Sequence, residues 1–506
     1  MDDCKLLRIP LKKRTAILRI TFFLAVVLVL NGLLTGLFQT KDKEEFSAEY
    51  YNFPRDTFDV VFAGPSVSME GIYPMNLWDE YGIASYNLSC GNQSLACSYY
   101  LVKEAIRKDS PDVVVVDTFY CGYSDLYLDK DKVHMITDSM PFWSRTRAQM
   151  IRDLIPQEQR LEFWLPLDLF HSRWKDLKKQ DFEAEDARLT LGAYIRARSV
   201  QAVPAEVKES DAELPENSRI YIEKIIRLCR ENNVPLVLTM MPVQGQAAWF
   251  GSLDSQFRYA SEIQEIADSN GVPYLDFLHD DSMLHLDPAK DTRDGIHLNI
   301  YGAAKMSSWM GQYLRTNYNV PDRRQDPKYQ FLQTREAEYH RLFIQRSLES
   351  TNRLEYYLDL VHGEISSPDW LVVITTQNAL PSGQITSAEQ DTLEQIGIRA
   401  DLTAGCSEYI AVLDGGELVH EETGHNEMSP IRYEGTVSGL PVEIVSQPDY
   451  ATDPDSVRIN DGEYAQGGHG LNIVVYDKKA GKLIDSVSFD FAREEPAEHV
   501  VKASIE

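Results

Sequence analysis

The feature that most constrains the fold is a series of short, strongly apolar runs in the N-terminal part of the chain. Runs this apolar are typical of strands buried on both faces, as in a parallel sheet covered by helices. Stretches with helical patterning alternate with them, and this order predicts an α/β domain with a flavodoxin-like, doubly wound parallel sheet. The predicted strands are residues 59–64, 84–90, 112–118, 235–241 and 273–277, and the predicted helices include 101–108, 218–231 and 262–269.

The uncharged stretch Ile20–Phe38 is the second constraint. Its length is close to the ~20 residues that cross a hydrocarbon core. Basic residues crowd residues 1–19, whereas the charges just after the stretch nearly cancel, which predicts a cytoplasmic N-terminus and an exported body. A cleaved signal peptide is the alternative, but the stretch is longer than a usual h-region and no clean A-x-A site follows. We therefore expect a single-pass anchor in the cell membrane, with the main body extracytoplasmic.

Composition excludes some classes of partner. The formal net charge of -28 argues against a nucleic-acid surface, and 43% hydrophobic residues indicate a globular body. The six cysteines form no CxxC pair, so a structural zinc site is not expected. We also expect no catalytic metal and no cofactor. A Cys90–Cys97 disulfide is one interpretation, but the low density of cysteines favours unpaired buried thiols.

The predicted sheet domain, residues 55–318, contains an insertion at about residues 122–215. Trp143, Trp164 and Trp174 lie there among arginines. The insertion is predicted to be either a helical lid that binds a sugar or an acyl donor, or a helical subdomain whose tryptophans are core. Aromatic residues at helical spacing favour the second interpretation.

A polar connector and a charged helix, predicted for residues 335–360, occupy the linker 319–364. A second, smaller α/β domain is predicted for residues 365–506. Thr386 and Glu389 form a capping box for a helix that Gly397 ends. The predicted strands of this domain are residues 370–375 and 407–413, and a hairpin of residues 470–477 and 482–489.

Candidate catalytic residues lie where predicted strands end. Ser66 follows the first strand in VVFAGPSVSM, and Asp294 and His297 follow the last strand in DTRDGIHLNIYG. The carboxyl ends of parallel strands meet at one edge, so these residues are predicted to meet there. A serine needs a base to become a nucleophile, and a carboxylate on the other imidazole nitrogen sets the tautomer. The sequence therefore predicts a Ser66–His297–Asp294 triad.

These motifs resemble those of the SGNH (GDSL-like) hydrolase family over about residues 55–318. The first block is matched by Gly64-Pro65-Ser66, and the last, D-x-x-H-x-x-x-x-G, by Asp294, His297 and Gly302. The resemblance implies that Gly91 supplies an N–H to the oxyanion hole. The family's third block normally adds an asparagine, but this chain has DTFYCGYSD there. Asn92 is the alternative donor.

Within the family, the chain looks most like the membrane-anchored, extracytoplasmic branch that includes alginate O-acetylation proteins and the D-alanylation protein of teichoic acids. Those proteins work beside a membrane-bound O-acyltransferase. The resemblance implies a serine esterase or O-acyltransferase that acts on acyl groups of a cell-surface polysaccharide. The alternative is a non-catalytic assembly or glycan-binding protein of the same fold, which the missing asparagine favours and the intact triad disfavours. A lipase at the membrane ranks below both.

The C-terminal part resembles an interleukin-like EMT inducer (ILEI) domain. GLNIVVYDKKAGKLIDSVSFD carries the resemblance, together with WLVVITTQNALPSGQITSAEQDTLEQIGI and SEYIAVLDGG. The two halves stand in the reverse of the order in the animal domain. Because related domains bind carbohydrate, the resemblance implies that this domain holds the glycan, and a scaffold or partner-docking role has equal weight.

Overall fold

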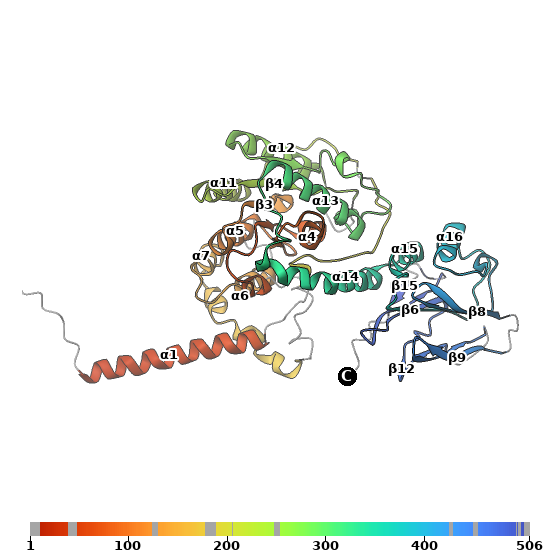
Figure 1. Ribbon diagram of the computed structural model, residues 1–506. Helices are drawn as coiled ribbons and strands as arrows, with labels where there is room; N and C mark the ends of the chain where they lie inside the picture. The colour runs from red at the N-terminus through yellow and green to blue at the C-terminus, as the bar shows by residue number, and fades with distance from the viewer. Residues whose placement is uncertain are drawn as a thin grey trace, which may run out of the picture.

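A computed structural model shows one long N-terminal helix, a helix-covered parallel sheet and a second unit rich in strands (Figure 1). The residues that the structure describes are 11–38, 48–123, 130–177, 189–204, 206–246, 253–424, 429–448, 454–491, 493 and 497–499.

The first unit is built on five parallel strands in the order β2-β1-β3-β4-β5. This is the flavodoxin-like order, and it confirms the predicted fold class. Every strand lies within one of the five predicted runs: β1 (Val60–Ala63), β2 (Ser85–Asn87), β3 (Val113–Asp117), β4 (Leu236–Met240) and β5 (Tyr274–Asp276). The strand order reverses between β1 and β3, so the carboxyl ends of these two strands are where such a sheet opens a crevice for ligands.

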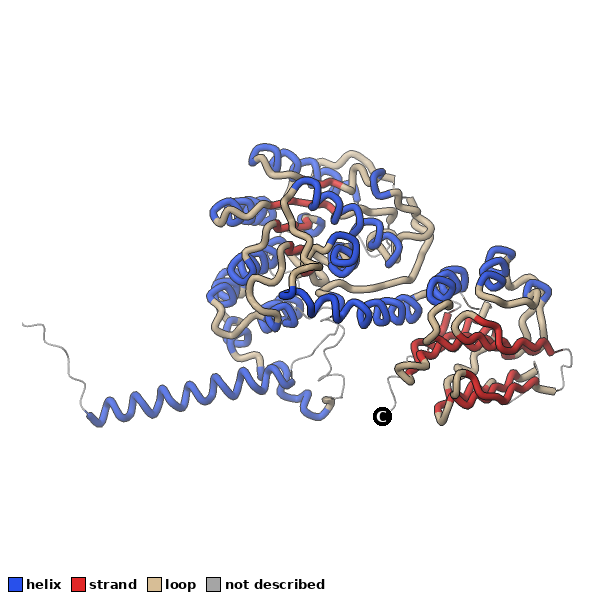
Figure 2. The backbone as a smooth tube through the Cα atoms, viewed as in Figure 1, coloured by secondary structure: helices blue, strands red, loops and turns tan. Residues whose placement is uncertain are grey.

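Helices cover both faces of this sheet (Figure 2). One layer contains helices that pack side by side: α5 (Leu95–Asp109), α11 (Glu216–Glu231) and α12 (Leu253–Asn270). In the other layer, α13 packs against α3 and α4; these are α3 (Ser66–Gly71), α4 (Pro74–Tyr81) and α13 (Ile300–Asn317). Each helix turns an apolar face to the sheet, and strands β1 to β4 are buried, whereas the edge strand β5 is half-buried.

Among the described residues of the insertion, the named helices lie between residues 130 and 175. Its helices are α6 (Lys130–Ser139), α7 (Arg145–Leu154), α8 (Arg160–Trp164), α9 (Leu167–Phe170) and the 3₁₀ turn η2 (His171–Lys175). Residues 193–204 and 206–214 carry no helix. The interpretation of all the tryptophans as core is wrong, because Trp143 is 79% and Trp174 is 60% exposed. Trp143 lies in the turn between α6 and α7, and Trp174 lies in η2, and neither segment is large enough to enclose its tryptophan.

The linker contains two helices where one was predicted, α14 (Gln330–Ser350) and α15 (Leu354–Glu364). The prediction of a single helix over 335–360 is wrong because the two helices pack into different places. Tyr339 of α14 is buried in the core of the first unit, whereas Leu348 and Leu354 are buried in the core of the second. Figure 1 shows α14 running between the two units. The break between the helices lets α15 change direction and pack in the core of the second unit.

The second unit combines helices with two antiparallel sheets. Its larger sheet has the order β15-β14-β13-β6-β7-β8 and contains the predicted strands and hairpin. These strands are β6 (Trp370–Gln377), β7 (Glu408–Asp414), β8 (Glu417–Gly424), β13 (Gly470–Asp477), β14 (Lys482–Phe489) and β15 (Ala497–His499). The predicted capping box of Thr386 and Glu389 begins α16 (Ser387–Gln395).

The smaller sheet was not predicted. It contains β9 (Ile431–Val437), β10 (Leu440–Ser446), β11 (Ser456–Ile459) and β12 (Gly462–Glu463). An apolar layer that includes Val442 and Ile444 packs it against the larger sheet.

The N-terminal helix α1 (Leu11–Phe38) is long and apolar enough to cross a membrane, with a mean hydropathy of 2.4 in an 18-residue window of Thr15–Phe38. By length and composition alone it is a candidate membrane span or signal sequence. The cysteines at positions 90, 97, 121, 229 and 406 are all free thiols, so the predicted preference for unpaired thiols is confirmed at these positions and the Cys90–Cys97 disulfide is not formed.

Candidate active site

Ser66 stands on a tight turn between β1 and α3. Gly64 leads into this turn, and a Cβ there would lie 2.8 Å from the Cβ of Asp117, so only glycine fits beside β3. The carbonyl of Pro65 accepts hydrogen bonds from the N–H groups of Ser68 and Met69, both at 3.1 Å. Ser66 is therefore the first residue of α3, where a backbone N–H has no acceptor within the helix. Its side chain is partly exposed, whereas Pro65 and Val67 are buried.

The loop before α13 holds His297 in a fixed position. Asp294 folds this loop, because its Oδ1 accepts hydrogen bonds from the backbone N–H groups of Ile296 (3.0 Å) and His297 (2.9 Å). Asn299 caps α13 just beyond it. The last residue of the motif, Gly302, lets the helix approach the loop, since a Cβ there would lie 2.3 Å from the carbonyl oxygen of Asp291.

The structure brings the three predicted triad residues together. His297 Nε2 lies 2.8 Å from Ser66 Oγ, and His297 Nδ1 lies 2.9 Å from Asp294 Oδ2. Partial burial raises the pKa of Asp294, but hydrogen bonds and charge from His297, together with the charge of Arg293, outweigh it and hold the pKa at about 2. At neutral pH the chain of contacts is thus a hydroxyl, an imidazole and an ionised carboxylate, in the order that an activated serine needs.

A buried ion pair ties the helix of Ser66 to the loop of His297. Arg293 Nε lies 2.8 Å from Glu70 Oε2, and Arg293 Nη2 lies 3.3 Å from Asp294 Oδ2. The Glu70 side chain is only 3% exposed. Burial raises the pKa of Glu70, against the opposing charges of His297 and Arg293. One guanidinium therefore joins a carboxylate of α3 to the carboxylate that orients His297.

The two predicted oxyanion residues, Gly91 and Asn92, lie in the loop after β2. The backbone N–H of Cys90 donates to the carbonyl of Gly64 (3.2 Å), which holds this loop against the turn that carries Ser66. Asn92 adopts a left-handed backbone conformation with φ 54°. Its side-chain Oδ1 accepts a hydrogen bond from the Tyr120 hydroxyl at 3.1 Å.

Tyr120 is a site residue that the sequence reasoning missed. It lies in the 3₁₀ turn η1 (Phe119–Gly122) after β3, within DTFYCGYSD, where the resemblance led us to expect an asparagine. Burial raises the pKa of Tyr120 to about 12, and a hydrogen bond with Ser66 works in the opposite direction. Its hydroxyl therefore lies near the candidate nucleophile and donates to Asn92. The only sequence signal was the position of the residue, at the carboxyl end of the strand next to β1.

Comparison with known proteins gives similarities only among solved structures. No protein-family model matches the chain, and neither does any curated protein. A protein from Bacteroides fragilis named as an acylhydrolase is 14% identical, with a TM-score of 0.29, over 53% of this chain and 94% of that one. A GDSL-like lipase from Bacteroides thetaiotaomicron is 13% identical, with a TM-score of 0.29, over 54% of this chain and 98% of that one.

A third similar structure is a protein from Desulfitobacterium hafniense, named as a lipolytic protein of the G-D-S-L family. It is 11% identical, with a TM-score of 0.28, over 50% of this chain and 98% of that one. TM-scores this low carry no argument about activity. What the site can do therefore follows from the contacts of Ser66, His297 and Asp294.

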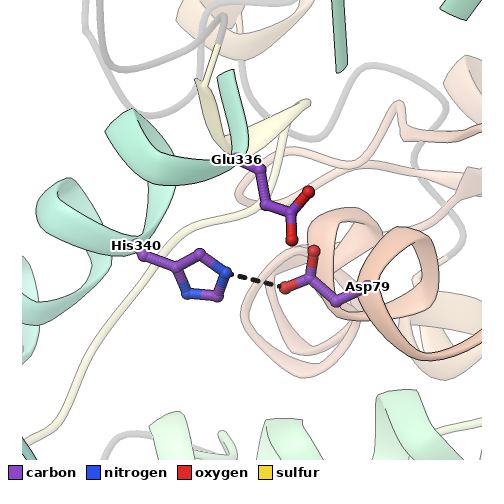
Figure 3. A group of neighbouring side chains, drawn as sticks. All are labelled: Asp79, Glu336 and His340. Atoms are coloured by element: carbon purple, nitrogen blue, oxygen red, sulfur yellow. Dashed lines mark ion pairs between the residues drawn. The ribbon is translucent and has the colours of Figure 1, made fainter. Parts of the chain in front are cut away.

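A second cluster of polar side chains lies between α4 and α14. Asp79, Glu336 and His340 place their ligand atoms within 4.8 Å of one another (Figure 3). His340 Nε2 is 3.2 Å from Asp79 Oδ2, and a hydrogen bond with this carboxylate raises the pKa of His340. Because the raised pKa favours the charged form of His340, we interpret the cluster as an ion pair that fastens α14 to α4.

Proposed function

We propose that the chain is a serine esterase or O-acyltransferase that acts on acyl groups of a cell-surface polysaccharide. The observation that carries the proposal is the continuous contact from Ser66 Oγ through the two nitrogens of His297 to Asp294. Ester cleavage and acyl transfer share their first step, attack by an activated serine on an acyl carbonyl.

His297 acts as the base in this mechanism. It takes the Ser66 proton on Nε2 as Oγ attacks the carbonyl carbon, and it returns that proton to the leaving hydroxyl. Asp294, ionised at neutral pH, accepts the Nδ1–H hydrogen bond and stabilises the imidazolium. A water or a sugar hydroxyl then attacks the acyl-enzyme, with His297 again taking the proton. Water yields an esterase, and a sugar hydroxyl yields a transferase.

The negative charge on the carbonyl oxygen needs donors next to Ser66. We assign this role to the backbone N–H groups of Ser66 and Gly91, with the Asn92 side chain beside them. A donor of this kind contributes about 3–4 kcal/mol to transition-state stability. Tyr120 replaces the expected third-block asparagine as the polar group facing Ser66, and it also fixes the orientation of the Asn92 amide.

The substrate class and location rest on the resemblance and on α1. In the proposal, α1 anchors the protein in the cell membrane with its N-terminus in the cytoplasm, and the body works outside, beside a membrane-bound O-acyltransferase. The chain carries a formal net charge of -28, and its excess of acidic residues lies in the body, which suits a neutral glycan better than a polyanion. The second unit, which resembles an ILEI domain, holds the glycan in this proposal.

A non-catalytic assembly or glycan-binding role is the second candidate, and the absence of the third-block asparagine favours it. A fluorophosphonate probe distinguishes the two, because it labels only an activated serine. The full-length protein should be labelled and should hydrolyse p-nitrophenyl acetate, and Ser66→Ala should lose both properties. Ser68→Ala is the matched control on the same helix, since its hydroxyl bonds with Ser89 instead of His297. Labelling that survives in Ser66→Ala would rule out Ser66 as the nucleophile.

A further inference from the structure

Other parts of the chain cover the C-terminal end of α1. Most of its side chains are exposed, but Asn31 and Thr35 are only 6% and 7% exposed. The short helix α9 and the turn η2 of the insertion pack against this part of α1. Arg173 of η2 donates a hydrogen bond from Nη1 to the carbonyl oxygen of Phe38 at 2.8 Å. Figure 1 shows the yellow helical segment of the insertion beside the end of the red helix.

The position of these contacts along α1 fixes the depth of the insertion in a membrane. The uncharged stretch Ile20–Phe38 is roughly 28 Å long as a helix, close to the thickness of a hydrocarbon core. Asn31, Thr35 and Phe38 all belong to this stretch. If Ile20–Phe38 spans the membrane, α9 and η2, which pack against this part of α1, cannot lie in bulk water. They must lie in the headgroup region or in the outer part of the hydrocarbon core.

The exposed side chains of this segment fit such a position. Leu161 is 67% exposed, Leu169 is 41% exposed and Trp174 is 60% exposed, although all lie on a folded part of the chain. Transfer of apolar side chains of this size from water into an apolar phase is favourable, so three of them together give appreciable affinity for lipid. Arg173 and Lys175 flank Trp174, and tryptophan beside basic residues is typical of the membrane interface.

We infer that residues 160–175 form a second membrane contact, which lies in the outer lipid interface beside α1. This inference rests on the proposed membrane-spanning role of α1. The occupant of the exposed apolar surface is lipid, because α9 and η2, which carry Leu169 and Trp174, pack directly against a membrane helix. Two attachments would hold the first unit close to the membrane and limit its rotation about α1.

Site-directed spin labelling of the full-length protein in phosphatidylcholine–phosphatidylglycerol vesicles tests this inference. A nitroxide is attached at Leu169→Cys in a protein that also carries Cys4→Ser and Cys406→Ser, so that these two cysteines are not labelled. Its collision rates with oxygen, which partitions into lipid, and with a water-soluble nickel chelate are then compared. Val419→Cys is the matched control, since Val419 is 47% exposed on β8 of the second unit. A label at Val29→Cys, within the uncharged stretch, reports whether α1 is inserted.

We expect the oxygen-to-nickel ratio at Leu169 to exceed that at Val419 severalfold and to approach that at Val29. A label at Leu161→Cys should behave like Leu169, which guards against a local effect of one substitution. A lipid-like ratio at Val29 with a water-like ratio at Leu169 overturns the inference and leaves the anchor intact. A water-like ratio at Val29 refutes the anchor itself. Low collision rates with both reagents at Leu169, together with a spin-label spectrum that broadens as the protein density in the vesicles rises, indicate that a second copy of the chain covers this surface. This result also overturns the inference.

Discussion

Replacement of Asp294 by asparagine should disable the site through the tautomer of His297. In the structure, Asp294 Oδ1 accepts hydrogen bonds from two backbone N–H groups, and Oδ2 faces His297 Nδ1. An asparagine must keep its oxygen toward the two N–H donors, because an NH₂ group there would meet only donors. Its NH₂ group then points at Nδ1 and makes that nitrogen an acceptor. The proton moves to Nε2, the nitrogen that should accept the proton of Ser66.

Two effects determine how much activity Asp294→Asn should lose. The pKa of Asp294 is about 2 instead of its ordinary 3.8, so the contacts with His297 and Arg293 stabilise the ionised carboxylate by roughly 2 kcal/mol. The Asp294 side chain is 24% exposed, so solvent screening limits this electrostatic part. The wrong tautomer adds to it, and in a Ser–His–Asp triad the whole exchange costs on the order of 10⁴ in kcat.

The assay is the hydrolysis of p-nitrophenyl acetate and the rate of fluorophosphonate labelling, for Asp294→Asn and Asp294→Ala side by side. Alanine removes the carboxylate but leaves His297 free to adopt either tautomer, so we expect it to retain more activity than asparagine. Thermal unfolding of both variants checks that each is folded. Asparagine activity close to the unsubstituted protein, or clearly above that of alanine, would refute the reasoning, because neither agrees with a locked tautomer.

Three further changes test other contacts. Tyr120→Phe should lower kcat about 3–10-fold with KM nearly unchanged, since the hydroxyl near the nucleophile is lost together with its hydrogen bond to Asn92, and steady-state kinetics measures this split. Gly302→Ala should lower the free energy of unfolding by about 1–3 kcal/mol in urea titrations, because a Cβ there collides with backbone, whereas Gly363→Ala, where nothing lies within 4 Å, should be neutral or stabilising. Burial lowers the pKa of His499, but its hydrogen bond with Asp485 outweighs this and leaves the pKa raised above 6.5. The contact between His499 and Asp485 therefore stabilises the folded protein fully below about pH 6.5, and this stabilisation disappears as the pH rises through the folded-state pKa of His499. Thermal unfolding should show this pH dependence for the unsubstituted protein and not for His499→Gln.

The parallel sheet could be predicted because its strands are buried on both faces. Burial on both sides requires nearly every residue to be apolar, as in VVVVD of β3, so the runs stand out without any knowledge of their neighbours. The smaller sheet of the second unit has the opposite character. Strands such as IRYEGTV of β9 place charged or polar residues on their exposed face. Alternation over so few residues is a weak signal, and only packing against the larger sheet stabilises these strands.

The triad residues could be predicted because topology, not packing detail, brings them together. Ser66 follows β1, and His297 lies beyond the last strand, so a parallel sheet places both at one edge. Tyr120 could not be assigned in the same way. Its contacts with Ser66 and Asn92 depend on the path of the 3₁₀ turn after β3, and no spacing in the sequence encodes that path.

Two carboxylates lie within reach of His297, and their surroundings separate their roles. Glu70 follows Ser66 by four residues, so both side chains lie on the same face of α3. By this spacing alone, Glu70 is as plausible a carboxylate partner for His297 as Asp294 is. Burial raises the pKa of Glu70, whereas that of Asp294 is held near 2 by His297 and Arg293. Opposite shifts in one site mark different tasks. Asp294 carries the charge that orients the base, and Glu70 holds Arg293, which fixes the distance between the nucleophile helix and the histidine loop.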